Sequence, residues 1–171
     1  YVFNMCSAYI DKLEEFRKMS PELKDLSQGS RIAFVRQFRR LTQDYIAGEL
    51  GLSHDNKRRI MTRYEKGNRC PKDDRTLELS KILNVSFNAI KKYDFNKPID
   101  LIYMLMWLEE LIPNYQIDLS ITPNIKNEDI PIYQKFMDEW NVMRRKRKYR
   151  EISYDEYLEW KFKYELGDDK L

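Results

Sequence analysis

The sequence is poor in the residues that build catalytic and metal sites. Its 171 residues include one histidine, two cysteines (Cys6 and Cys70) and five glycines. A zinc site needs several clustered Cys or His ligands, and a phosphate-binding loop needs closely spaced glycines. We therefore expect no enzyme activity, no metal and no cofactor. So few cysteines also make a disulfide framework improbable, which suits a reducing compartment.

Long apolar runs are missing as well. No stretch approaches the roughly 20 apolar residues that span a bilayer. Residues 1–12 lack the basic start and apolar stretch of a signal peptide. Hydrophobic residues make up 42% of the chain and charged residues 35%, enough for both a core and a hydrated surface. We expect a cytoplasmic protein without a membrane partner.

Positive charge is concentrated in the middle of the chain. Residues 29–98 hold 16 Lys and Arg against 8 Asp and Glu, whereas residues 1–28 hold 4 against 5 and residues 99–171 hold 11 against 15. A basic segment of this kind is what neutralisation of nucleic-acid phosphates needs. The alternative is chance clustering in a chain rich in lysine and arginine.

The basic segment contains the pattern of a helix-turn-helix. Thr42 can cap a helix that ends at Gly51, where a left-handed backbone lets the chain turn sharply. Ser53 can cap a second helix, which ends near Gly67. The small Ala47 and Gly51 let two helices cross at close range, as a helix-turn-helix requires. The side chains expected to face inward from the first helix are Tyr45, Ile46, Ala47 and Leu50.

This stretch resembles the phage-repressor-like (XRE-type) helix-turn-helix regulators over residues 29–93. The matching residues, in order, are Arg36, Leu41, Thr42, Gln43, Ala47, Leu50, Gly51, Leu52, Ser53, Arg63, Tyr64, Glu65, Lys66, Gly67, Pro71, Leu79, Ser80, Leu83, Val85 and Ser86. The resemblance implies a DNA-binding unit of five helices. One departure is a surplus of about four residues, close to one helical turn, between Ser53 and Met61. Either the recognition helix is a turn longer or the loop before it is wider.

The resemblance also implies DNA contacts for particular side chains. Gln43 and Lys66 would contact phosphates, and Arg63 would contact a base. The candidates for base edges near the start of the recognition helix are Asn56, Lys57 and Arg59. Arginine suits guanine, and asparagine suits adenine.

A further helix is expected over residues 30–40, with Ile32, Val35 and Phe38 facing inward. Its arginines are Arg31, Arg36, Arg39 and Arg40, and we expect them to be available to solvent or phosphate. Arg36 has an alternative that the resemblance suggests, an internal pair with Glu65. The sequence leaves the two roles of Arg36 open.

Within this unit the pattern also predicts a helix from Asp74 or Arg75 to Leu83 and a short one over residues 87–90, which Ser86 can cap. Outside it, helices are expected over residues 1–18, from Ser20 onward, and over residues 99–112 and 131–148. A closing helix is expected after residues 153–156, where Ser153 and Glu156 have the spacing of a capping box. Residues 99–112 are apolar on more than one face, which is typical of a buried or interface helix. Residues 115–121 alternate like a half-buried strand. The strand either pairs with its copy in a second subunit or lies extended on helices.

Two further surfaces have two interpretations each. The basic run at residues 144–150 either binds phosphates or is a solvated helix end favoured by the helix dipole. The closing helix carries Tyr157, Trp160, Phe162 and Tyr164, which either stack on bases or belong to the core. Helical spacing favours the core.

These patterns predict a mainly α protein in three parts: a helical arm (residues 1–28), a five-helix repressor-like DNA-binding domain (residues 29–94), and a helical dimerisation or partner domain (residues 99–171) with at most one short strand. A polar hinge at residues 94–98 separates the last two. The expected function is sequence-specific transcription regulation in a bacterial or mobile-element source. A dimeric repressor would read a palindromic operator in double-stranded DNA through the helix after Ser53. The alternative is a protein-binding inhibitor or antitoxin-like protein that engages a partner through residues 99–171.

Overall fold

The computed structural model describes residues 21–52, 57–112 and 126–167. The elements are α2 (Gln28–Phe38), α3 (Gln43–Glu49), α4 (Lys57–Glu65), α5 (Asp73–Leu83), α6 (Phe87–Ile90), α7 (Pro98–Leu111), the 3-10 turn η1 (Asn127–Asp129), α8 (Ile130–Lys148) and α9 (Tyr154–Phe162). These described ranges contain eight α-helices and no strand, which confirms the mainly α prediction. The helix predicted over residues 1–18, the strand predicted over residues 115–121 and the cap predicted at Ser53 lie outside the described residues.

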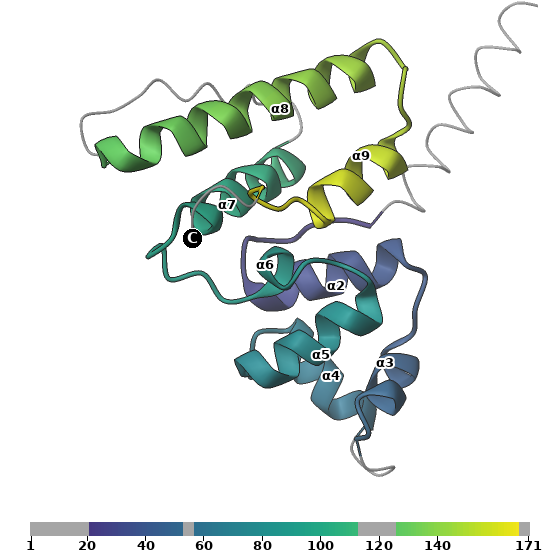
Figure 1. The fold of residues 1–171 in the computed structure, drawn as a ribbon. Coiled ribbons are helices and arrows are strands. Elements are labelled where there is room, and N and C mark those ends of the chain that lie inside the picture. The colour runs from purple at the N-terminus through teal and green to yellow at the C-terminus, as the bar shows by residue number, and fades with distance from the viewer. Residues whose placement is uncertain (1–20, 53–56, 113–125, 168–171) are drawn as a thin grey trace, which may run out of the picture.

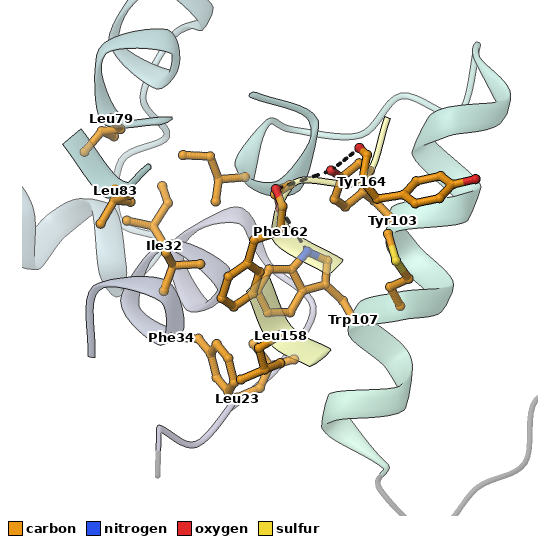
Figure 2. Packing of buried hydrophobic residues seen from close by; sticks show 14 of the residues in the cluster. Leu23, Ile32, Phe34, Leu79, Leu83, Tyr103, Trp107, Leu158, Phe162 and Tyr164 are labelled. Atoms are coloured by element: carbon orange, nitrogen blue, oxygen red, sulfur yellow. Dashed lines mark hydrogen bonds between the residues drawn. The ribbon is translucent and has the colours of Figure 1, made fainter. Parts of the chain in front are cut away.

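Helix α2 occupies the middle of the molecule (Figure 1). Helices α3, α4 and α5 lie on one side of it, and α7, α8 and α9 lie on the other. The side chain of Phe162, at the end of α9, connects α9 to both α2 and α7. Its ring centroid is 6.3 Å from that of Phe34 and 5.4 Å from that of Phe38, both on α2, and 5.7 Å from that of Trp107 on α7. Figure 2 shows this aromatic contact within one continuous hydrophobic core.

Helix α7 is buried on several sides, as its composition predicts. Ile99, Ile102, Tyr103, Leu105, Met106 and Trp107 are all buried. The Tyr103 hydroxyl donates to the carbonyl of Tyr164 at 2.6 Å, and the Trp107 indole donates to the carbonyl of Ala89 at 2.9 Å. The buried Tyr103 hydroxyl and Trp107 indole therefore both have partners, and α7 is held between α6 and the segment that follows α9.

A polar network ties α7 to α8 and α9. Glu109 on α7 accepts from Lys161 at 2.8 Å and from the Tyr157 hydroxyl at 2.7 Å, and it pairs with Arg144 of α8 at 3.0 Å. Lys161 also pairs with Glu110 at 2.6 Å. Burial by itself raises the pKa of Glu109, but Lys161, Tyr157 and Arg144 together outweigh it and hold the pKa below its ordinary value. The buried charges are thus compensated by one another.

Three helix caps predicted from the sequence are present. The Thr42 hydroxyl accepts from the Tyr45 amide at 3.1 Å, and Ser86 caps α6 through the Asn88 amide at 3.3 Å. Ser153 begins α9 with a complete capping box, in which Glu156 supplies the returning carboxylate. These local signals set where three helices begin.

The short helix predicted from Ser20 onward is wrong for the described residues 21–27, which are not helical. Their backbone amides find other partners. The Ser30 hydroxyl accepts from the amides of Lys24 and Asp25 at 3.1 and 3.2 Å. The Asp25 carboxylate accepts from the Ser27 amide at 2.7 Å. Side chains that bond nearby backbone in this way compete with helix formation.

The prediction that Arg31 faces solvent or phosphate is also wrong. This side chain is only 2% exposed. Its guanidinium donates to the carbonyls of Ala89 and Lys91 at 3.0 and 2.8 Å and lies 3.9 Å from the centre of the Tyr93 ring. Burial lowers the pKa of Arg31 below its ordinary value. Arg31 therefore fastens α2 to the end of α6.

Arg36 on α2 and Arg39, the residue just after it, are also used internally rather than facing solvent or phosphate as expected. Arg39 donates to the carbonyl of Leu83 at 2.9 Å and forms an ion pair with Glu159 of α9. Arg36 pairs with Glu65 at the end of α4, so the internal alternative for Arg36 is the one observed. Of the four arginines in this stretch, only Arg40 is exposed.

Candidate nucleic-acid interface

The turn after α3 has the geometry that the sequence predicts. Gly51 has a φ of +65°, in the left-handed region that favours glycine. The Leu52 amide donates to the carbonyl of Ala47 at 3.0 Å, which closes the end of the helix. Ala47 is fully buried. The small side chain and the tight turn let α3 pack closely against α4.

One inward prediction in α3 is wrong. Tyr45 is 51% exposed, whereas Ile46, Ala47 and Leu50 are buried. These three side chains fill the inner side of a helix of only 7 residues. Tyr45 therefore places an aromatic ring on the surface, in the first turn of α3.

Helix α4 has one apolar side and one basic side. Met61 and Tyr64 are buried, while Arg59, Arg63 and Lys66 are exposed. The three exposed cations follow one another at spacings of four and three residues, so they share one face of the helix. Each of them points away from Met61 in the helical projection. The face opposite the core is therefore a row of three cations.

The chain closes tightly after α4. The Lys66 amide donates to the carbonyl of Thr62 at 3.0 Å, and the Gly67 amide donates to that of Tyr64 at 3.1 Å. Gly67 has a φ of +72°. Lys66 thus continues the helical path for one more residue and stays in line with Arg59 and Arg63.

Gln43 connects the two helices of the motif. Its side-chain amide nitrogen donates to Glu65 at 2.7 Å, and its oxygen accepts from the Thr62 hydroxyl at 3.0 Å. An amide nitrogen carries two hydrogens, and the contact with Glu65 uses one of them. Gln43 therefore fixes α3 relative to α4. The contact with Glu65 leaves the second N–H of its side-chain amide available to another acceptor.

Glu65 connects α2, α3 and α4, and the sequence indicated this only in part. Its carboxylate receives Arg36 Nε at 2.5 Å, Arg36 Nη2 at 3.0 Å and Gln43 at 2.7 Å. The pairing with Arg36 was one of two alternatives from sequence, but the contact with Gln43, 22 residues earlier, has no local signal. Because this carboxylate is neutralised inside the motif, it does not offset the cations of α4.

The predicted site residues fall into three groups. Arg59, Arg63 and Lys66 come together on one exposed face, and Gln43 lies where α3 meets α4. Lys57 is the first residue of α4, and the structure describes only its backbone. Asn56 lies outside the described residues altogether.

The structure shows the backbone of four of the residues between Ser53 and Met61, where the sequence has its surplus of about four residues. Residues 57–60 belong to α4, so one full turn of helix precedes Met61. This observation matches the longer-helix alternative for these four positions. Residues 53–56 are outside the described ranges.

No family model, curated protein or solved structure matches this chain. In the part of the chain that the structure describes, no helix has the length and apolar character to cross a bilayer. The described residues also contain no group of three or more His, Cys, Asp or Glu side chains placed to hold a metal ion.

Proposed function

We propose that the chain is a sequence-specific DNA-binding transcriptional regulator that reads DNA through α4. The observation that carries the proposal is the row of exposed cations on α4, directly opposite its buried side. An α-helix with its side chains is about 10–12 Å across. The major groove is about 12 Å wide and admits one α-helix. The dimensions and the charge of α4 both suit that groove.

Base contacts are assigned to the side chains nearest the groove floor. Arg59 and Arg63 are four residues apart, about 6 Å along the helix, which corresponds to roughly two base-pair steps. Each guanidinium can bond a guanine edge with two N–H groups. Asn56 and Lys57, just before them in the sequence, are further candidates for base edges. Arg59 and Arg63 are the residues expected to set sequence preference.

Phosphate contacts are assigned to the flanks of the helix. Lys66 ends the basic row, where the chain leaves α4, and a lysine acts on phosphate as a point charge. Gln43 uses one amide hydrogen on Glu65, and the second hydrogen of that amide would serve a phosphate. These contacts orient the helix and carry no sequence information.

A dimer on a palindromic operator is part of the proposal. One unit of this size covers about half a site, and affinity and specificity normally come from two units on symmetric half-sites. Residues 99–171 remain the proposed dimerisation or partner segment. On α7, Leu101, Met104, Leu108 and Leu111 are only partly buried and offer apolar surface for this contact.

The proposal is tested by fluorescence anisotropy with the DNA upstream of the protein's own gene and with a scrambled duplex of equal length. Titrations run from about 50 to 200 mM salt, because nonspecific phosphate binding falls steeply over that range. A preference for the upstream DNA that survives at the higher salt supports the proposal. If neither duplex binds at low salt, the regulator proposal fails, and the protein-binding alternative is then tested by a search for a partner of residues 99–171.

A further inference from the structure

The end of α8 carries a second basic surface, which the proposed function does not use. Six of the seven residues from 144 to 150 are Lys or Arg. Two of these cations are held against the protein: Arg144 pairs with Glu109 at 3.0 Å, and the Arg147 guanidinium lies 4.2 Å from the centre of the Tyr154 ring. The other four, Arg145, Lys146, Lys148 and Arg150, are exposed. We call these four the α8 basic surface.

The α8 basic surface has little compensating charge. None of its four side chains forms an ion pair with an acidic residue among those described. The C-terminal helix dipole is equivalent to only about half a negative charge. Residues 144–156 contain six cations and three carboxylates. One of those carboxylates, Glu156, is already bound to the amide and hydroxyl of Ser153. Stabilisation of the helix end therefore accounts for only a small part of this charge.

The location of this surface separates it from α4. Figure 1 shows the end of α8 and the turn into α9 at one end of the molecule and helices α3 and α4 at the other. A duplex lying along α4 would therefore leave the α8 basic surface facing away from it. The two basic surfaces cannot both be parts of one short, straight binding site.

The side chains of the α8 basic surface favour nucleic acid as the partner. Two are arginines, whose planar forks match phosphate oxygens with paired N–H groups. Tyr149, between Lys148 and Arg150, is 64% exposed, and a tyrosine hydroxyl is a further donor that can bond a phosphate oxygen. A lipid surface would instead be recognised by an amphipathic helix with a broad apolar face. On α8 the apolar residues Phe136 and Trp140 are buried in the protein.

We propose that the α8 basic surface is a second nucleic-acid contact, which binds phosphate backbone without reading sequence. It acts independently of α4, so the inference does not rest on the proposed function. Where both surfaces are occupied, one chain holds two separate segments of nucleic acid.

The test uses the full chain carrying Arg59→Ala, Arg63→Ala and Lys66→Ala, which removes the row of three exposed cations described above. In this background, Arg145→Gln, Lys146→Gln, Lys148→Gln and Arg150→Gln are introduced together. The matched control changes four exposed lysines elsewhere, Lys81, Lys92, Lys97 and Lys135, to Gln, so that the net charge is the same. Circular dichroism melts check that each variant folds.

Binding of a labelled duplex of random sequence is measured by anisotropy at about 50 mM salt and upward. The α8 substitutions are expected to weaken binding at least about tenfold more than the control and to reduce the salt dependence of log K by about two to four. Equal binding by the α8 variant and the control would overturn the inference. The same variants are also tested on vesicles that contain anionic lipid. If the α8 substitutions weaken binding to these vesicles but not to the duplex, the surface is a membrane contact and the inference is overturned.

Discussion

Arg36 on α2 donates two hydrogen bonds to the Glu65 carboxylate at the end of α4, from Nε to Oε1 at 2.5 Å and from Nη2 to Oε2 at 3.0 Å. The same guanidinium donates to the carbonyl of Leu41 at 2.9 Å, so it also fixes the chain that leads into α3. Both side chains are mostly buried, at 15% and 8% exposure. This pair links α2 to the last residue of α4.

Arg36→Ala is expected to destabilise the protein by about 2–4 kcal/mol, because it leaves the Glu65 carboxylate largely buried with only Gln43 as a partner. Urea unfolding followed by circular dichroism measures the loss. The control is Lys163→Ala, which breaks a half-exposed pair with Glu159 at 3.3 Å and should cost less than about 0.5 kcal/mol. Equal losses in the two variants would mean that the Arg36 pair does not lock the helices.

Gly29→Ala is expected to disturb the contact between α2 and α4. A Cβ on Gly29 would lie 2.2 Å from the carbonyl oxygen of Tyr64 and 3.0 Å from that of Glu65. Both are backbone atoms, so neither can rotate away, and overpacking of this kind costs about 1–3 kcal/mol or more. Gly167→Ala is the control, since its nearest atom is the flexible end of Lys135 at 3.2 Å. Thermal melts that coincide for the two variants would contradict this prediction.

The sequence predicted the helices of this protein well where the signals are local. Apolar spacing placed α8 at residues 131–148, and the structure has it at Ile130–Lys148. The Ser153 and Glu156 pair predicted the start of α9 because both halves of a capping box lie within four residues. The aromatic residues of the closing segment were favoured as core: Tyr157, Phe162 and Tyr164 are buried, and Trp160 is partly buried against the core.

Contacts between distant residues were beyond the reach of sequence patterns. Arg31 was expected on the surface, because nothing nearby in the sequence shows that its partners are carbonyls 58 and 60 residues later. The hinge predicted at residues 94–98 is held in place by a fully buried residue that follows it: the Asp100 carboxylate accepts from the amides of Asp94 and Phe95 at 3.2 and 3.1 Å. For the candidate site, the sequence indicated the basic row on α4 but not the bond from Gln43 to Glu65.

The network at Glu109 predicts a specific pH dependence. Its pKa lies below the ordinary value of 4.5, so its ionised form contributes stability above pH 4.5, and this contribution is lost as the pH falls through the lowered pKa. Glu109→Gln is expected to cost about 2–4 kcal/mol at neutral pH, because it removes a carboxylate bonded to Lys161 and Arg144. The difference from the wild type should shrink below pH 4.5, as the wild-type carboxylate becomes protonated.

Urea unfolding across the range from pH 3 to pH 7 provides the measurement. The control is Glu128→Gln, since Glu128 is exposed and its contact with Lys126 is 4.0 Å long. That variant should follow the wild type at every pH. A difference between Glu109→Gln and the wild type that stays constant as the solution is acidified would argue against ionisation of Glu109 as its cause.

Arg59 and Lys66 lie on the same exposed face of α4, but the proposed function gives them different tasks. Arg59→Ala is expected to lose about 1–3 kcal/mol of binding to the operator and little to a scrambled duplex, because a base contact is made only to the right sequence. Lys66→Ala is expected to weaken both duplexes alike and to lower the salt slope by about one. Anisotropy titrations with both duplexes separate the two effects, with Lys81→Ala on α5 as the control. If Arg59→Ala weakens the two duplexes equally, then Arg59 contacts the backbone, and base reading must be assigned to other residues of the recognition helix.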